Sequence, residues 1–410
     1  MSHWTEFGFR NLPPLSSRER VTEIPPLLHA LIEPRRKLLA DPLEGVRAGD
    51  GLQSGLYPLR ATGVSTRPML DAALALLDAL DEEQRNRLIF PIDADEWRTW
   101  LNIHINFFRH GLMLEDLPPA TRELAIALMR TTLSARGFHQ ARDIMRINDF
   151  LVELTNRPDD FGEWPYFLSL FGRPSEEEPW GWQIDGHHLN INCVIIGDQM
   201  VMTPTFMGSE PCSIDAGPMA GIRVFAQEER VGLDMIRSLE APQAAKAILR
   251  PSIHPDDLPA DMQHLFDGRM LGGAFNDNAR IDYEGIRGSD LSDAQRRLLV
   301  SLVGTYVGWS RDDHAGVKMQ HVQEHLDETW FSWMGATGND GPFYYRVHSP
   351  VVLIEFDHHP GIVFDNEIPS PHHVHTLVRT PNGGDYGVDL LRQHHERYDH
   401  SHGDHRVRRD

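Results

Sequence analysis

The spacing of apolar residues predicts helices in three stretches of the chain. Between residues 66 and 160, apolar side chains recur every three or four positions, for example at Met69 and Leu76, as they do along the buried side of an amphipathic helix. The same spacing returns in residues 220–249 and 291–327. We therefore expect a helical lobe early in the chain and a second block of helices later.

From residue 161 onward, short aromatic and β-branched runs separated by Gly and Pro replace this spacing, a pattern typical of strands. The expected strands are residues 180–183, 187–196, 200–203, 343–348, 351–357 and 373–380, and a closing helix is expected at 388–398. Strands far apart in sequence must then share one sheet. The predicted fold class is α+β, with an N-terminal helical lobe packed on a mixed or antiparallel β-sheet whose strands come from the middle and the C-terminal part of the chain.

Changes in composition suggest three regions. Residues 1–65 are rich in Pro and Arg without sustained periodicity, so we expect an arm that wraps over the body. Residues 66–160 form the helical lobe, and residues 161–410 form an α+β body that carries the histidine-rich site. We expect the lobe and the body to make one continuous unit.

The charge balance narrows the set of partners. Lys and Arg number 39 against 60 Asp and Glu, a formal net charge of −21, which repels nucleic acids and anionic lipids. We expect a small-molecule substrate, no nucleic acid and no membrane, and a homo-oligomer remains open. Residues 1–7 lack a basic segment followed by an apolar one, and no run approaches the roughly 20 apolar residues of a membrane span. A cytoplasmic location is therefore expected.

Histidine is the residue type that stands out. Cys193 and Cys212 are too few for a disulfide framework and lack C-x-x-C spacing. Eleven of the 23 histidines, in contrast, follow Val347. Neutral imidazoles are common metal ligands and acid–base groups, so the chemistry is expected near the C-terminus.

The first candidate element is residues 186–192. In an extended strand His188, Asn190 and Asn192 share one face. If this face is buried, each unsatisfied amide or imidazole costs about 1–3 kcal/mol, and a ligand or metal would satisfy them. A solvated face of an antiparallel strand is the alternative.

The second candidate element is the pair His373 and His375. Two residues apart on a strand, they point to the same side about 7 Å apart at Cα, close enough to bind one ion. The expected metal ligands are His188, His358, His373 and His375. Three imidazoles leave an open position for water or substrate, and the ion is expected to be a divalent transition metal, either zinc or iron or copper. A metal-free histidine cluster that binds an anion or transfers protons is the alternative.

Other polar residues near these elements complete the predicted site. Arg379 would orient an acidic group, with Gly383 and Gly384 allowing close approach of a loop. The expected catalytic residues are Arg379, Asp357, Glu355, His187 and His394. The expected substrate-binding residues are Asn190, Asn192, Asn382, Asp385 and Trp182. A surface arginine at a helix start is the alternative for Arg379.

Two further patterns carry less weight. Residues 321–325 spell H-x-x-E-H, an inverzincin-type protease signature, but such a match arises easily by chance among 23 histidines. The Gly-rich residues 335–341 lack the Lys of a phosphate-binding loop, and we interpret them as a hairpin loop.

Several strings resemble the DUF3500 family, a family without an assigned reaction. They are WGWQ at 180–183, GHHL at 186–189, TPTFMG at 203–208, SPVVLIEFDH at 349–358 and HVHTLVRTPNGGDYG at 373–387. The resemblance spans most of the chain and implies a shared fold. It also implies that the motif positions include His187, His188, His358, His373, His375, Arg379, Asn382, Asp385 and His394, whereas the H-x-x-E-H string lies outside them.

The predicted function is a metal-dependent enzyme that acts on a small organic substrate. Zinc is slightly favoured because it needs no redox partner, and with zinc the protein would be a hydrolase or lyase, with Asp357 or Glu355 as general base. Iron or copper held by the same histidines would make it an oxidoreductase that uses dioxygen. A non-catalytic protein that binds a metal or a ligand in a closed shell is the alternative from another class.

Overall fold

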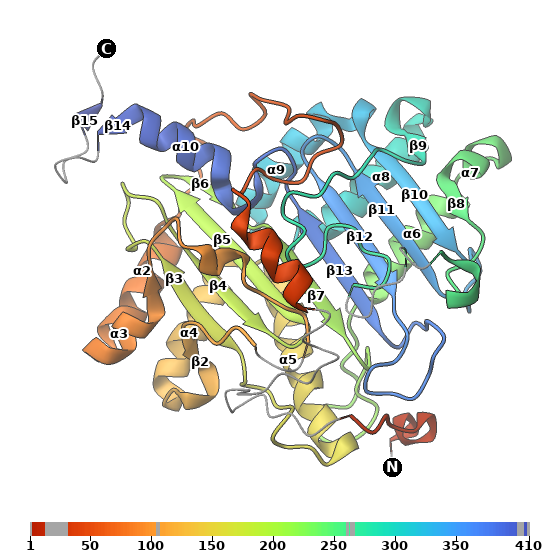
Figure 1. Ribbon diagram of the computed structural model, residues 1–410, viewed down its shortest axis with the longest axis horizontal. Helices are drawn as coiled ribbons and strands as arrows, with labels where there is room; N and C mark the ends of the chain where they lie inside the picture. The colour runs from red at the N-terminus through yellow and green to blue at the C-terminus, as the bar shows by residue number, and fades with distance from the viewer. Residues whose placement is uncertain are drawn as a thin grey trace.

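A mixed sheet runs through the middle of the molecule, and most of the longer helices lie on one of its faces (Figure 1). The structure, a computed structural model, describes residues 2–12, 32–103, 107–259, 262, 267–399 and 406–407. Residues 13–31 of the predicted N-terminal arm lie outside the described residues.

The sheet combines strands from the middle and from the end of the chain. Along its main path it contains β1 (Ile89–Phe90), β3 (Phe167–Phe171), β4 (Trp180–Gly186), β5 (Leu189–Ile196), β7 (Thr205–Ser209), β13 (Val374–Arg379), β12 (Leu353–His358), β11 (Phe343–His348), β10 (Trp330–Gly335) and β8 (Ile248–Arg250). Beside this path β2 (Leu112–Met113) pairs with β3, β6 (Gln199–Val201) with β5, and β9 (Ile286–Arg287) with β10, while β14 (Tyr398–Asp399) and β15 (Arg406–Val407) form a separate pair. The β1–β3 and β8–β10 pairs are parallel and the other described pairs are antiparallel. The predicted fold class is thereby confirmed.

The helices occupy the stretches that the apolar spacing indicated. They are α2 (Arg67–Asp78), α3 (Glu82–Leu88), α4 (Pro119–Thr132), α5 (Ala135–Thr155), α6 (Ala226–Arg237), α7 (Ala241–Ala247), α8 (Asp293–Val307), α9 (Asp312–Glu324) and α10 (Val388–Arg397). Side-chain caps define several of the starts; for example, Ser134 accepts a hydrogen bond from Gly137 N in α5, and Ser292 forms a capping box in α8. None of the described helices is long and apolar enough to cross a membrane.

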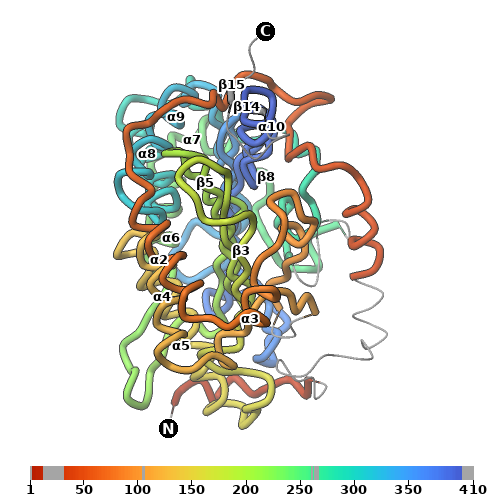
Figure 2. The backbone as a smooth tube through the Cα atoms, turned by 90° about the vertical axis from the view of Figure 1, so that its left-hand side faces the viewer, coloured from red at the N-terminus to blue at the C-terminus, as the bar shows by residue number. Residues whose placement is uncertain are grey.

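One face of the sheet is apolar and packs against these helices. Seen edge-on, α2, α4, α5, α6, α8 and α9 lie on the same side of the strands (Figure 2). Ile144 of α5, Met235 of α6 and Leu302 of α8 share one buried cluster with sheet residues such as Val374 and Val378. Burying this apolar area is the main stabilising contribution to the fold.

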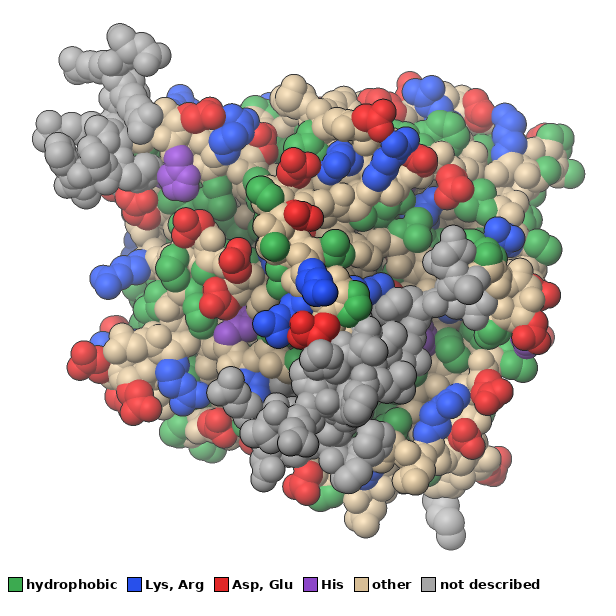
Figure 3. All heavy atoms as spheres, in the orientation of Figure 1, with side chains coloured by type: hydrophobic (Ala, Val, Ile, Leu, Met, Phe, Trp, Pro, Cys, Tyr) green, Lys and Arg blue, Asp and Glu red, His purple; other side chains and the backbone are tan. Residues whose placement is uncertain are grey.

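The other face of the sheet carries its buried polar residues together with smaller apolar clusters, and it is covered mainly by irregular segments. On β13, alternation turns His375 and Arg379 away from the helices. Residues 32–47, 95–103 and 267–285 cross over this face (Figure 1, Figure 2). On the surface above them, Lys and Arg side chains are interspersed with Asp and Glu (Figure 3). The candidate chemistry therefore lies between the sheet and a cover without long helices.

The hairpin of β4 and β5 differs from the prediction at its turn. The predicted strand began at His187, whereas β5 begins at Leu189 and His187-His188 form a two-residue turn. His188 adopts a left-handed backbone conformation with φ 59°, which is uncommon for residues other than Gly and draws attention to this residue. The predicted hairpin loop at 335–341 is confirmed between β10 and β11.

Two glycines in helices test the packing of the helical layer. A Cβ on Gly137 of α5 would lie 2.2 Å from the Trp309 carbonyl oxygen, whereas one on Gly316 of α9 would meet nothing within 4 Å. We expect Gly137→Ala to lower the free energy of unfolding by about 1–3 kcal/mol through overpacking. Gly316→Ala should leave it unchanged or raise it by up to about 1 kcal/mol. Urea unfolding measures both, and a Gly137→Ala protein as stable as wild type would contradict the close approach of α5 to Trp309.

Candidate metal centre

Three histidines bring their ring nitrogens together on the polar face of the sheet. His188 comes from the β4–β5 turn, His373 directly precedes β13, and His375 is its second residue. The Nε2 atoms are 2.9 Å apart in the His373–His375 pair, 3.2 Å in the His373–His188 pair and 3.3 Å in the His375–His188 pair. All three side chains are buried. We call this group the histidine triad.

Strand pairing explains why the triad forms. β7 and β13 are antiparallel with His375 opposite Gly208, and the Gly208 N–H donates a 2.8 Å hydrogen bond to the His188 carbonyl oxygen. A Cβ on Gly208 would lie 3.0 Å from the His375 ring and 3.1 Å from the His188 ring. Glycine at this position therefore leaves room for both imidazoles.

The spacing of the nitrogens fits a metal ion. Tetrahedral coordination with metal–nitrogen bonds of 2.0–2.1 Å places neighbouring ligand nitrogens about 3.3 Å apart, close to the observed 2.9–3.3 Å. The Nδ1 atom of His373 lies 2.7 Å from the Pro360 carbonyl oxygen, which can only accept a hydrogen bond. In neutral His373 the proton therefore sits on Nδ1, and Nε2 presents a lone pair to the centre of the triad.

Burial keeps two of these histidines in the form that binds metal. It lowers the pKa of His188 and of His375 well below 6.5, and the neighbouring histidines add to the effect. A neutral imidazole with a free lone pair is the form that a metal requires. The triad could therefore hold a metal ion.

A second set of residues supports the triad. The Glu210 carboxylate lies 3.5 Å from Nδ1 of His373 and accepts hydrogen bonds from the backbone N–H groups of residues 362–364. His187 stacks on His188 with ring centroids 4.0 Å apart, and its Nδ1 lies 2.7 Å from Asn148 Oδ1. Such contacts orient ligands and tune their basicity. The sequence alone did not indicate Glu210, because this residue follows β7 and lies far from any histidine along the chain.

Asp185 is a second residue that the sequence analysis missed. It lies opposite Asn190 in the β4–β5 pair and accepts a 3.3 Å hydrogen bond from its amide. Asn190 in turn lies opposite Phe206, whose ring meets the His375 ring edge-on at 5.1 Å. Burial raises the pKa of Asp185 to about 8, so this acid carries a proton at neutral pH. Its position directly before Gly186 and the histidine pair was the available signal.

The two asparagines of β5 lie on the same polar face. The Asn192 amide donates to Asn190 Oδ1 at 2.8 Å and to the Pro204 carbonyl oxygen at 2.8 Å. Gln183 donates to Asn192 Oδ1 at 2.6 Å. These hydrogen bonds fix the positions of Asn190 and Asn192 on the polar face. The alternation along the sequence suggested that the two residues share this face.

His358, a predicted ligand, lies apart from the triad. Among the residues that the structure describes, the group able to hold a metal consists of His188, His373 and His375. Alternation along β12 turns Asp357 to the polar face and His358 to the helix side, where its Nε2 lies 3.1 Å from Glu229. Its Nδ1 accepts a hydrogen bond from Phe343 N. His358 therefore does not belong to this group.

The predicted acids of β12 lie on the same side of the sheet as the triad and form hydrogen bonds within the protein. Asp357 receives two hydrogen bonds from the guanidinium of Arg269, at 2.5 and 2.7 Å. Glu355 accepts from Tyr344 at 2.6 Å and from the backbone N–H groups of residues 271 and 272 at 2.8 Å. Burial raises the pKa of both acids. These bonds fasten the covering segment 267–285 to the sheet.

Arg379 and Asp385 belong to the same set of contacts between the sheet and the covering segment. Arg379 Nη1 lies 3.0 Å from Asp277 and 3.0 Å from Asp385, and Nε donates to the Gly272 carbonyl oxygen at 2.6 Å. Burial by itself would lower the pKa of Arg379, but the two carboxylates outweigh it and raise the pKa. The guanidinium is thus engaged with groups of the protein.

Three predicted residues lie outside the triad and its surroundings. Trp182 packs under the helices, where its Nε1 donates to Thr132 at 3.2 Å. Asn382 holds a loop through the Pro350 carbonyl oxygen at 2.8 Å. His394 is buried on α10 beside Tyr398, with ring centroids 4.8 Å apart.

Comparison with known proteins yields one match. A family model described as "Protein of unknown function (DUF3500)" matches residues 62–388, which is most of the chain and includes the triad. No curated protein and no solved structure matches the chain.

The protonated state of Asp185 predicts how stability depends on pH. Between its unfolded pKa of about 3.9 and its folded pKa of about 8, the native state binds a proton that the unfolded state has released. The free energy of unfolding therefore falls as pH rises through this window. Asp185→Asn removes this effect, so its stability relative to wild type should increase from pH 4 to pH 8, by an amount on the order of 5 kcal/mol.

Urea unfolding at several pH values measures this difference. Asp340→Asn, in the exposed loop between β10 and β11, is the matched control and should show a constant difference from wild type. A constant difference for Asp185→Asn as well would mean that Asp185 is ionised in the folded protein.

Proposed function

The chain belongs to the DUF3500 family, which has no assigned reaction, and we propose from the histidine triad that it is a metal-dependent enzyme acting on a small organic substrate. The observation that carries the proposal is the convergence of three Nε2 atoms to within 3.3 Å of one another. Three imidazoles hold an ion and leave a coordination position open, as catalytic zinc sites do.

The donor set favours zinc and hydrolase or lyase chemistry. The triad supplies three neutral nitrogens and neither a thiolate nor a carboxylate, a set typical of catalytic zinc. When bound, zinc acts as a Lewis acid and makes a water molecule acidic near neutral pH. Iron or copper in the same triad would instead indicate an oxidoreductase. The identity of the bound metal therefore distinguishes a hydrolase or lyase from an oxidoreductase.

The residues around the triad receive separate roles in this proposal. Asp185, which is protonated at neutral pH, is the candidate acid that donates a proton to a leaving group. Asn190 holds Asp185 and Asn192 in place. Glu355, Asp357 and Arg379 act as positioning residues, because their bonds fasten the cover over the site.

Metal content tests the proposal. Tag-free protein purified without added metal should contain close to one equivalent of zinc by elemental mass spectrometry. His373→Asn/His375→Asn should lose it, because two of three ligands are removed. His358→Asn, a change at an equally buried histidine on the other face, should keep it, and near-UV circular dichroism checks that each variant is folded.

Each result has a definite meaning. Absence of metal from wild type even after reconstitution, or equal loss in His358→Asn, would overturn the metal centre. If the protein binds metal but the metal-loaded form hydrolyses ester, amide or lactone substrates no faster than the metal-free form, the results would favour a protein that binds metal without catalysis.

Glu210 offers a finer test of the support for the triad. We expect Glu210→Gln to weaken zinc affinity by about 10- to 100-fold, because changes to such supporting groups typically do so. Competition with a chromogenic chelator measures the affinity. Glu229→Gln, beside His358 on the other face, is the control and should leave the affinity unchanged; equal weakening in both variants would argue against a specific role for Glu210.

A further inference from the structure

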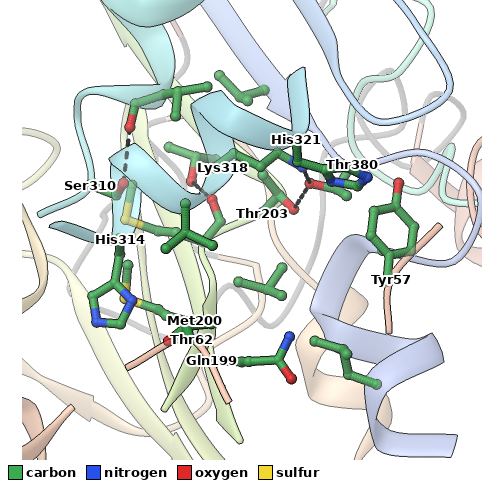
Figure 4. Close-up of a pocket in the computed structure, with 18 of the residues that line it drawn as sticks. Tyr57, Thr62, Gln199, Met200, Thr203, Ser310, His314, Lys318, His321 and Thr380 are labelled. Atoms are coloured by element: carbon green, nitrogen blue, oxygen red, sulfur yellow. Dashed lines mark hydrogen bonds between the residues drawn. The ribbon is translucent and has the colours of Figure 1, made fainter. Parts of the chain in front are cut away.

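A cavity of about 150 Å³ lies on the helix side of the sheet, between α9, the end of β13 and the segments 56–62 and 199–205 (Figure 4). Val378, which lines it, belongs to the apolar cluster under the helices, whereas His375 points to the opposite face. The cavity is therefore separate from the histidine triad, although both use β13.

Polar groups enter this cavity from one side of α9. His314, Lys318 and His321 are spaced by four and three residues, so they follow one face of the helix. The remaining wall is largely apolar and includes Met200, Met202, Val317, Val378 and Trp309. The combination of an apolar wall with a few converging polar groups is typical of a small-molecule site.

The charge of the lining is opposite to that of the whole protein. The chain carries a net charge of −21, yet the described residues that line the cavity include Lys318 and Arg60 and no Asp or Glu. Arg60 is exposed at the mouth. An anion entering the cavity would therefore meet two cations and no lining carboxylate.

Lys318 is the cation inside. Its Nζ donates to the Val351 carbonyl oxygen at 2.8 Å and to Thr380 Oγ1 at 3.2 Å, and it lies 5.8 Å from the centre of the Tyr57 ring. No described carboxylate forms an ion pair with it. Burial lowers the pKa of Lys318 to about 8, with Asp385 opposing the shift, so the amine is still mainly charged at pH 7. Charged groups enclosed in a protein are normally paired with a group of opposite charge, and this is the partner that Lys318 lacks among the described residues.

Two further groups are available to a ligand. Thr380 Oγ1 accepts a hydrogen bond from Lys318 and lies 2.8 Å from Thr203 Oγ1, and its hydroxyl proton can rotate toward a ligand. His314 is 5% exposed, and its Nε2 has no hydrogen-bond partner. Figure 4 shows Lys318 and Thr380 at one end of the cavity and His314 toward the other.

We propose that this cavity binds a small organic monocarboxylate with an apolar body, and that the carboxylate lies on Lys318 and the Thr380 hydroxyl. The volume sets the size, because a cavity of about 150 Å³ accommodates a benzene-sized group. The three donors of an ammonium group allow Lys318 to keep both internal bonds and still bind the carboxylate.

Benzoate is the probe that tests this site, with calorimetry as the readout. Benzoate should bind wild type, and benzamide, its neutral counterpart, should bind much more weakly. Lys318→Met should weaken benzoate binding by more than about tenfold, the loss expected for a charge-assisted hydrogen bond. Lys246→Met, at an exposed lysine paired with Asp290, should not change the affinity.

The histidine triad could also take a carboxylate, so the measurement is repeated in His373→Asn/His375→Asn. Benzoate binding that persists there and is lost in Lys318→Met supports the proposal. Binding lost in the triad variant but kept in Lys318→Met would place the ligand at the metal centre and overturn it. No binding to wild type, or equal binding of benzamide, would overturn it as well, and the comparison of probes holds even if Lys318→Met does not fold.

Discussion

The pairing of β7 with β13 is the interaction on which the rest of this structure depends. It joins strands from the middle of the chain to strands from its end, through a register that runs from Val374 opposite Ser209 to Val378 opposite Thr205. His188 and His373 are 185 positions apart in sequence, and this pairing brings their ring nitrogens together. Closing such a long loop costs conformational entropy, and the buried apolar face offsets that cost.

The two faces of the sheet follow different physical rules. Apolar burial stabilises the helix side of the sheet. Because this interaction is not directional, it constrains the size and shape of the side chains more than their chemical groups. The other side adds buried charges and hydrogen bonds to its smaller apolar clusters, as in the Asp357–Arg269 pair and the contacts of Arg379. Removing one partner of a buried ion pair costs about 3–5 kcal/mol. The cover over the triad is therefore specified by its polar contacts, although it has little regular structure.

β13 links the two sites that we infer. Its odd-numbered residues, from His373 to Arg379, serve the polar face, while Val378 and Thr380 line the cavity under α9. Because β13 is buried on both sides, a shift of the residues on one face would also move the residues on the other face. This arrangement explains why one short stretch of sequence carries so many polar and histidine residues.

The sequence by itself determined what depends on local pattern. Alternation and apolar spacing were sufficient for the α+β class, the three C-terminal strands and the shared face of His373 and His375, because these follow from periods of two and 3.6 residues. Only the tertiary structure decided which histidine joins that pair, since the choice between His188 and His358 depends on strand register and on the face that each side chain takes. It likewise showed that Arg379 is already paired and that Asp185 and Lys318 are enclosed. Such properties arise from distances between residues far apart in the chain, which no local pattern encodes.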